Sequence, residues 1–151
     1  MTSLIAALLL ISPACCAEPK APSEPIQVVV LVILASDQNE NVHERIREIA
    51  AEIRKKSPQL KSFDLHRTIS KMIRLGESIP VEVIDNVKID LTLNEKTDDE
   101  GRVTMTVKTP KLDEITYACT CGKFFPIITN HVTEDKHRLI IAIMAKPCKK
   151  K

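Results

Sequence analysis

Residues 26–34 read IQVVVLVIL, an almost continuous apolar run that is dominated by β-branched side chains. Nine residues suit a strand, and β-branched residues favour the extended backbone. A strand that is apolar on both faces needs cover on both, because exposing either face to water costs free energy. The run therefore predicts a strand that is central in its sheet or covered on both sides.

The segment that follows has the pattern of an amphipathic helix over residues 41–55. Its apolar residues form one stripe with spacings of 4, 3 and 4, namely Val42, Ile46, Ile49 and Ile53. Asn41 is a candidate N-cap, and Glu44 three residues later would complete a capping box. Pro58 follows the last apolar residue and stops the helix. We expect the stripe to pack on a sheet.

From Phe63 onward the apolar period is two, which is typical of antiparallel strands with one wet face. Arg67 and Lys71 interrupt this alternation in the one or two strands expected before Gly76. A hairpin turn at Asp85-Asn86 is predicted next, because both residues tolerate a positive φ. The other strands are predicted at residues 79–84, 87–93, 103–107, 115–121 and 138–145, with a short apolar stretch at 124–128. The fold class is therefore α+β: a mainly antiparallel β-sheet or small sandwich with one amphipathic helix packed on it.

The chain before the first strand has the features of an export signal. Residues 4–11, LIAALLLI, are uncharged and too few to span a bilayer, and small residues follow them. We place the cleavage after Ala17, so that residues 1–17 form a secretory signal peptide. Residues 18–25 contain three prolines and indicate an extended linker. One domain is expected over residues 26–148, and residues 149–151 are a basic tail.

Two other interpretations of the N-terminus remain open. Cys15 or Cys16 would carry a lipid if the cut fell just before it, and the proline-rich stretch would then be a tether to the membrane. The apolar run would alternatively be a buried helix of a cytosolic protein. The lipid anchor and the cleaved signal peptide both predict an exported protein, periplasmic or extracellular. The protein would contact the membrane only if it carried the lipid.

Composition excludes several classes of function. The net charge is +2, from 22 basic and 20 acidic residues, which is too balanced for nucleic acid as a main partner. The chain has three Phe, one Tyr and no Trp, which argues against base-stacking platforms and aromatic sugar-binding faces. Three glycines are too few for a phosphate-cradling loop. No pattern in the sequence indicates a nucleophile, a base and an oxyanion donor that act together, so we expect neither an enzyme nor a cofactor.

Three cysteines remain after the predicted cleavage: Cys119, Cys121 and Cys148. An oxidising compartment favours a structural disulfide, in which Cys148 would pair with Cys119 or Cys121. A direct bridge between Cys119 and Cys121 would be strained and therefore redox-active. A metal site is a further alternative, with the three cysteines and His131 or His137 as ligands. The odd count leaves at least one thiol for other chemistry, including a bridge to another molecule.

From Val87 onward the strand pattern resembles the C-terminal part of the secretin domain of type II and type III secretion systems. The resemblance covers residues 87–145 and is carried by four stretches: VKIDLT at 87–92, DDEGRV at 98–103, IITNHVT at 127–133 and LIIAI at 139–143. The chain departs from the family at Ala142 and Ile143, where secretins have glycines. The resemblance implies a periplasmic assembly or interaction module without catalytic residues. Together these features predict a small exported binding or structural module whose partner is a protein or a second copy of itself, and the alternative is a thiol-redox or metal-binding protein.

Overall fold

A computed structural model describes residues 24–84, 86–95, 100–109 and 112–146 of the 151-residue chain. The strands within these ranges are β1 Ile26–Ser36, β2 Ser62–Ile73, β3 Ser78–Ile84, β4 Val87–Glu95, β5 Arg102–Thr109, β6 Leu112–Thr120, β7 Phe125–Val132 and β8 Arg138–Lys146. A short 3-10 helix, η1 Glu44–Ile46, leads into the helix α1 Arg47–Lys56. Residues 1–23 and 147–151, and with them the predicted signal peptide, most of the linker and the basic tail, lie outside the described residues.

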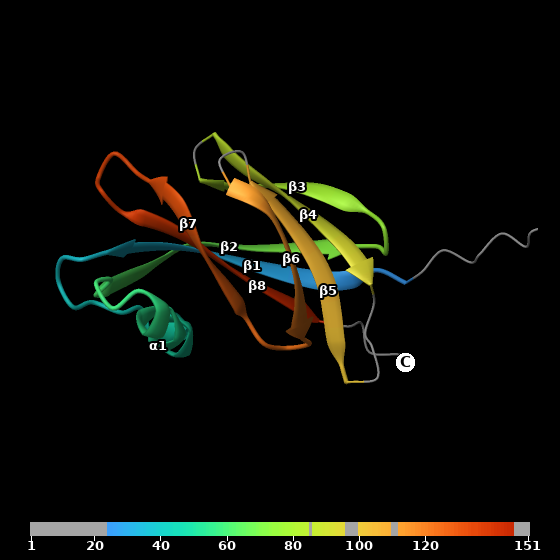
Figure 1. Ribbon diagram of the computed structural model, residues 1–151, viewed down its shortest axis with the longest axis horizontal. Helices are drawn as coiled ribbons and strands as arrows, with labels where there is room; N and C mark the ends of the chain where they lie inside the picture. Colours follow the sequence, from blue (N-terminus) through green and yellow to red (C-terminus); the bar gives the residue numbers. More distant parts are fainter. Residues whose placement is uncertain (1–23, 85, 96–99, 110–111, 147–151) are drawn as a thin grey trace, which may run out of the picture.

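The strands form two four-stranded antiparallel sheets that pack face to face (Figure 1). Sheet A has the order β2-β1-β8-β7, and sheet B has the order β3-β4-β5-β6. The chain passes from sheet A to sheet B after β2 and returns after β6, so neighbouring edge strands are joined at each side of the sandwich. The prediction of a mainly antiparallel β structure with one helix is confirmed.

β1 is a central strand and is covered on both of its faces. One set of its side chains packs against sheet B in the core between the sheets: Ile26, Val28, Val30 and Val32. The alternate set packs beneath α1 in a second core cluster: Leu31, Ile33 and Ala35. β8 divides in the same way, with Ile141 and Ile143 between the sheets and Ile140 and Ala142 under the helix. Cover on both faces explains why neither strand shows polar alternation.

The helix begins later than its sequence pattern predicts. Residues 41–43 are extended, because the backbone N–H of Phe63 donates to the carbonyl of Asn41 at 2.7 Å and the N–H of His43 donates to the carbonyl of Phe63 at 3.0 Å. Val42 therefore forms a parallel bridge with Phe63 instead of starting the helical stripe. The capping box of Asn41 and Glu44 was a wrong prediction. His43 caps η1 instead, since its Nδ1 accepts from the N–H of Arg45 at 3.3 Å.

Within its observed bounds α1 buries Ile49, Ala50 and Ile53 against sheet A. Its last turn carries Arg54, whose guanidinium donates to the carbonyl of Lys61 at 2.6 Å. No helix in the described part of the chain is long and apolar enough to cross a bilayer. The helix therefore serves as the cover of one sheet face.

The predicted hairpin between β3 and β4 is present. Asn86 has a φ of 60°, which is the left-handed backbone that the prediction assigned to this turn. Its neighbour Asp85 lies outside the described residues. The turn places Ile84 opposite Val87 after a register shift at Glu82.

Three edge strands carry features that oppose the addition of another strand. Pro80 lies in β3 and Pro126 lies in β7, and proline has no N–H to offer a partner strand. On β2, Arg67 and Lys71 pair with Val32 and Val28 and so point toward sheet B. Inward-pointing charges are a known protection of edge strands, because pairing with another sheet would bury them. The charges that interrupt the alternation thus have a structural role.

The hairpin between β7 and β8 is held by its own hydrogen bonds. The N–H of Thr133 donates to the carbonyl of His137 at 2.8 Å, and Lys136 adopts a φ of 63°. The hydroxyl of Thr133 accepts from the N–H of His137 at 3.1 Å. Before this turn β7 bulges, and the buried Thr129 hydroxyl donates to the carbonyl of Leu139 at 2.7 Å. The loop is therefore a defined structure that can position side chains.

Candidate functional site

Cys119 lies in β6 and points into the core between the sheets. It is 5% exposed, and burial raises the pKa of its thiol, with the neighbouring Cys121 adding to this effect. Backbone hydrogen bonds with Ala145 and Val103 act in the opposite direction. A raised pKa keeps the thiol protonated at neutral pH, whereas the thiolate is the nucleophile and the metal ligand. The environment of Cys119 therefore suits a core side chain better than a reactive one.

The other candidate cysteines differ from Cys119 in their position. Cys121 lies in the turn after β6, is half-buried and packs against the core between the sheets. The described structure holds no disulfide between Cys119 and Cys121. Cys15, Cys16 and Cys148 are outside the described residues. The pairing of Cys148 and the attachment of a lipid therefore stay predictions.

The structure does not bring the cysteines together with the candidate histidines. His137 precedes β8, whereas the thiol of Cys119 is close to Ala145 near the other end of that strand. Eight residues at about 3.3 Å each place them roughly 25 Å apart. Within the described ranges, no three metal-binding side chains are grouped so that they could hold an ion. His131 and His137 instead line a cavity of about 500 Å³ with His66, between the ends of the two sheets.

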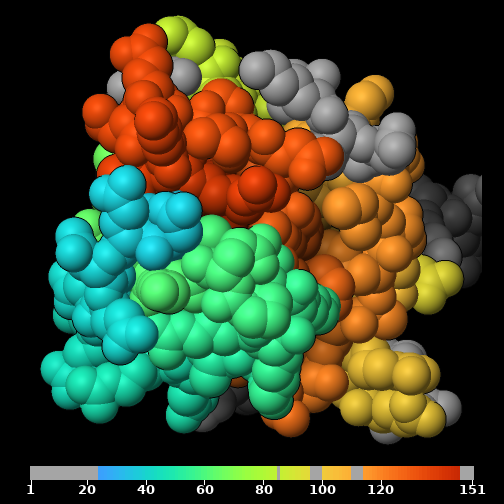
Figure 2. Space-filling view, turned by 60° about the vertical axis from the view of Figure 1, so that its left-hand side comes forward, coloured from blue at the N-terminus to red at the C-terminus, as the bar shows by residue number. Residues whose placement is uncertain are grey.

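A groove of about 780 Å³ runs between α1 and the start of β7. Its floor holds three consecutive apolar residues, Phe124, Phe125 and Pro126, and all three are half-buried. The opposite wall is the side of α1 that carries Glu48 and Glu52. In Figure 2, α1 (green) lies directly beside the segment of β6, β7 and their turn (orange). We call this feature the α1–β7 groove.

An aromatic stack supports the floor of the α1–β7 groove. The rings of Tyr117 and Phe125 are stacked with centroids 4.2 Å apart and an interplanar angle of 11°. The ammonium group of Lys56 lies 5.8 Å from the centroid of the Phe125 ring. Tyr117 is buried, its hydroxyl has no hydrogen-bond partner among the described residues, and burial raises the pKa of this hydroxyl. The stack restrains the Phe125 ring, so the floor is preorganised.

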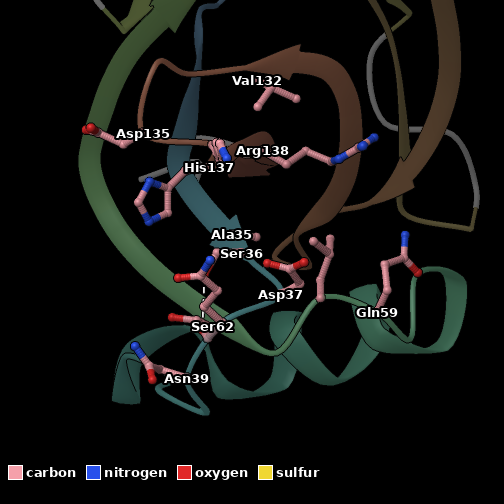
Figure 3. Close-up of a pocket in the computed structure, with 13 residues that line it drawn as sticks. Ala35, Ser36, Asp37, Asn39, Gln59, Ser62, Val132, Asp135, His137 and Arg138 are labelled. Carbon is pink, nitrogen blue, oxygen red and sulfur yellow. Dashed lines mark hydrogen bonds between the residues drawn. The ribbon is translucent and has the colours of Figure 1, made fainter.

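A second pocket, of about 490 Å³, lies at the far end of sheet A from the stack (Figure 3). Figure 3 shows His137 and Arg138 entering from the β7–β8 hairpin on one side, and Asp37 and Asn39 from the loop after β1 on the other. Ser62 at the start of β2 and Gln59 after α1 complete the wall. We call this feature the polar pocket.

Sequence reasoning missed both the α1–β7 groove and the polar pocket. The signal for the groove is the run Phe124-Phe125-Pro126, which places two of the three phenylalanines side by side. The signal for the polar pocket is weaker, because Asp37 and Arg138 are about one hundred residues apart in the chain and only the pairing of β1 with β8 brings them together. Of the predicted candidates that the structure describes, the polar pocket contains only His137.

Comparison with known proteins finds no family model, no curated protein and no solved structure that matches this chain. The resemblance to the secretin domain rests on residues of β4, β5, β7 and β8, which belong to two different sheets here. The chemistry of the described surfaces is therefore what indicates a function.

Proposed function

We propose that this protein is a small exported, non-enzymatic binding module that recognises a protein partner through the α1–β7 groove. The observation that carries the proposal is the half-buried apolar floor of Phe124, Phe125 and Pro126 beside the helix α1. Residues of this kind are normally covered, and clusters of them mark sites of interaction. The restrained aromatic stack beneath the floor lowers the entropic cost of binding there.

The charges around the groove favour a protein segment over a lipid or a polyanion. Glu48 and Glu52 line the wall on α1, whereas Lys56 and Lys123 lie at the end near the β6–β7 turn. An apolar centre with a mixed polar rim is the usual anatomy of a protein interface. A membrane surface or an acidic polymer would instead require one continuous basic face. The occupant we propose is a partner segment that presents one large apolar side chain flanked by charged residues.

The alternative of a thiol-redox or metal-binding protein has less support. It requires reactive thiols, and the burial of Cys119 acts against a thiolate. It also gains nothing from His137, which lies roughly 25 Å from Cys119 along β8. His131 lies in β7, and among the described residues it is not grouped with the cysteines in a set that could hold a metal ion. We therefore assign Cys119 to the core.

Export is tested separately from binding. We expect the mature protein, expressed from the full-length sequence in a bacterial host, to begin at Glu18. Intact-mass spectrometry distinguishes three outcomes. Loss of residues 1–17 supports the signal peptide, and a diacylglycerol mass on Cys15 or Cys16 supports the lipid anchor. An intact residue Met1 in most molecules would show that the export proposal is wrong.

The groove is tested with a pair of matched variants. Ala51→Trp places a bulky ring in the α1–β7 groove, and Arg47→Trp places the same ring on α1 outside it; both positions are exposed. Peptides selected from a random library on the whole chain are then titrated against both variants by fluorescence anisotropy. We expect Ala51→Trp to weaken binding by about tenfold or more, and Arg47→Trp to leave it unchanged. Equal affinity for the two variants, or a library that yields no binder, would refute the groove as the binding site.

A further inference from the structure

The polar pocket carries hydrogen-bonding capacity that the protein itself does not use. Ten of the thirteen residues that line it are polar. Among these ten side chains, only that of Ser36 is engaged in the described structure, where its hydroxyl donates to the carbonyl of Gln38 at 3.1 Å. The remaining donors and acceptors line the same hollow and form no hydrogen bond or ion pair with one another in the described structure. Unused polar groups around one hollow are what a polar ligand requires.

Among the Asp, Lys and Arg residues of the pocket, Arg138 is the one whose side chain is not fully exposed. Its side chain is half-buried, and it forms no ion pair or hydrogen bond in the part of the chain that the structure describes. The register explains why, because Arg138 lies opposite Ala35 on β1 and opposite Val132 on β7. Both flanking partners are apolar and offer no acceptor. A guanidinium in this position is suited to a planar, bidentate acceptor supplied from outside, such as a carboxylate.

The opposite side of the pocket presents negative charge. Asp37 projects from the loop after β1, across the pocket from the β7–β8 hairpin (Figure 3). Asp135 is a second carboxylate on the rim, and Lys136 is a second fixed cation. Two carboxylates thus balance two cations, and none of the four is paired with another across the pocket. A cavity with separated and unpaired charges of both signs is complementary to a ligand that carries both signs.

From this arrangement we infer that the polar pocket binds a zwitterion of the amino-acid class, either a free α-amino acid or a short peptide with free ends. The ligand carboxylate accepts from the guanidinium of Arg138, and its ammonium group donates to Asp37. The amides of Gln38, Asn39 and Gln59 provide donors and acceptors for the peptide groups in between. The volume of about 490 Å³ admits two or three residues. This inference is independent of the α1–β7 groove, which lies beside the opposite end of β8.

Other polar ligands fit less well. A neutral sugar would displace water from Arg138 and Asp37 without pairing either charge, and the lining holds no Phe, Tyr or Trp ring to stack on it. A polyanion would meet Asp37 and Asp135 as well as the cations. Because the pocket is open to solvent, water screens the ion pairs that it would form with the ligand. We therefore expect weak affinity, with Kd on the order of 1 mM.

The inference is tested by NMR titration of the uniformly ¹⁵N-labelled protein. The probes are L-alanine, tri-L-alanine, tri-L-alanine with an acetylated N-terminus, tri-L-alanine with an amidated C-terminus, and maltose. We expect saturable shifts of backbone amides in residues 37–39 and 136–138 with the free amino acid or tripeptide. Blocking either end should weaken binding by about tenfold, and maltose should cause no saturable shift.

Two variants and one control assign the charges. Arg138→Met should weaken binding of tri-L-alanine, so that it binds no more tightly than the form with an amidated C-terminus. Asp37→Asn should weaken binding of tri-L-alanine, so that it binds no more tightly than the form with an acetylated N-terminus. Glu40→Gln lies on the same loop outside the pocket and should change nothing. Asp37 is exposed on a loop, so its variant remains informative if Arg138→Met disturbs the fold. The inference fails if neither free probe gives saturable shifts, if blocked and free peptides bind equally, or if maltose binds more tightly than tri-L-alanine.

Discussion

Because β8 is covered on both faces, we predict similar losses of unfolding free energy when either of two adjacent isoleucines is replaced by alanine. Ile140 lies under α1 and Ile141 lies between the sheets, and both are 0% exposed. Substitution by alanine removes three buried carbons, which at about 0.8 kcal/mol per methylene gives roughly 2.4 kcal/mol of lost burial. The cavity that remains adds to this cost, so we expect each variant to lose about 3 kcal/mol of unfolding free energy. The two losses should be similar, because each face has its own packed layer.

The assay is urea unfolding followed by far-UV circular dichroism, since the chain has no tryptophan for fluorescence. The m-value should stay constant, so that the shift in midpoint reports stability alone. Val132→Ala is the control, because Val132 is 47% exposed on the neighbouring strand and should cost less than about 0.5 kcal/mol. If Ile140→Ala costs under about 1 kcal/mol while Ile141→Ala costs about 3 kcal/mol, α1 does not cover sheet A as described.

Four other predictions follow from single side chains. Tyr117→Phe removes a buried hydroxyl that has no partner in the part of the chain that the structure describes, and it should leave thermal stability unchanged or raise it by up to about 1 kcal/mol in a calorimetric scan. Burial raises the pKa of Cys119, so the folded chain holds this proton more tightly than the unfolded chain does. Stability should therefore fall as pH rises above about 8.5, and Cys119→Ala should flatten the fall in urea midpoints measured from neutral pH to about pH 10. Asn86→Gly should keep or raise the melting temperature, because φ is 60° there, whereas Asn86→Val should cost about 1 to 2 kcal/mol. Lys71→Val removes an inward-pointing charge from the edge strand β2 and should increase self-association in size-exclusion chromatography, where an unchanged elution volume would contradict the protective role.

Periodicity alone was enough to predict most of the fold. The run at residues 26–34 indicated a strand that is central in its sheet or covered on both sides, and β1 is central and has cover from sheet B and from α1. The turn at Asn86 followed from its tolerance of a positive φ. These features depend on residues that are close together in the chain, and they can therefore be predicted from the local sequence.

The start of the helix and the polar pocket depend on distant residues. Asn41 and Val42 have the local pattern of a helix start, but backbone pairing with Phe63 holds them extended. The polar pocket arises because Ala35 pairs with Arg138, and nothing near either residue indicates that pairing. The cysteines show the same limit, since the spacing of Cys119 and Cys121 suggested shared chemistry whereas burial of Cys119 decides its state.

The pairing of the first strand with the last has a kinetic consequence. Gln27 pairs with Lys146 and Ala35 pairs with Arg138, so sheet A closes only after about one hundred intervening residues have been synthesised. Such non-local contacts slow folding, because the entropy of a long loop must be lost before any contact compensates it. Until β8 arrives, the apolar residues of β1 lack one of their partner strands and are prone to aggregate. The export proposed above would make use of this order, because a chain that folds only after its last strand has been synthesised is still unfolded when it meets a translocation pore.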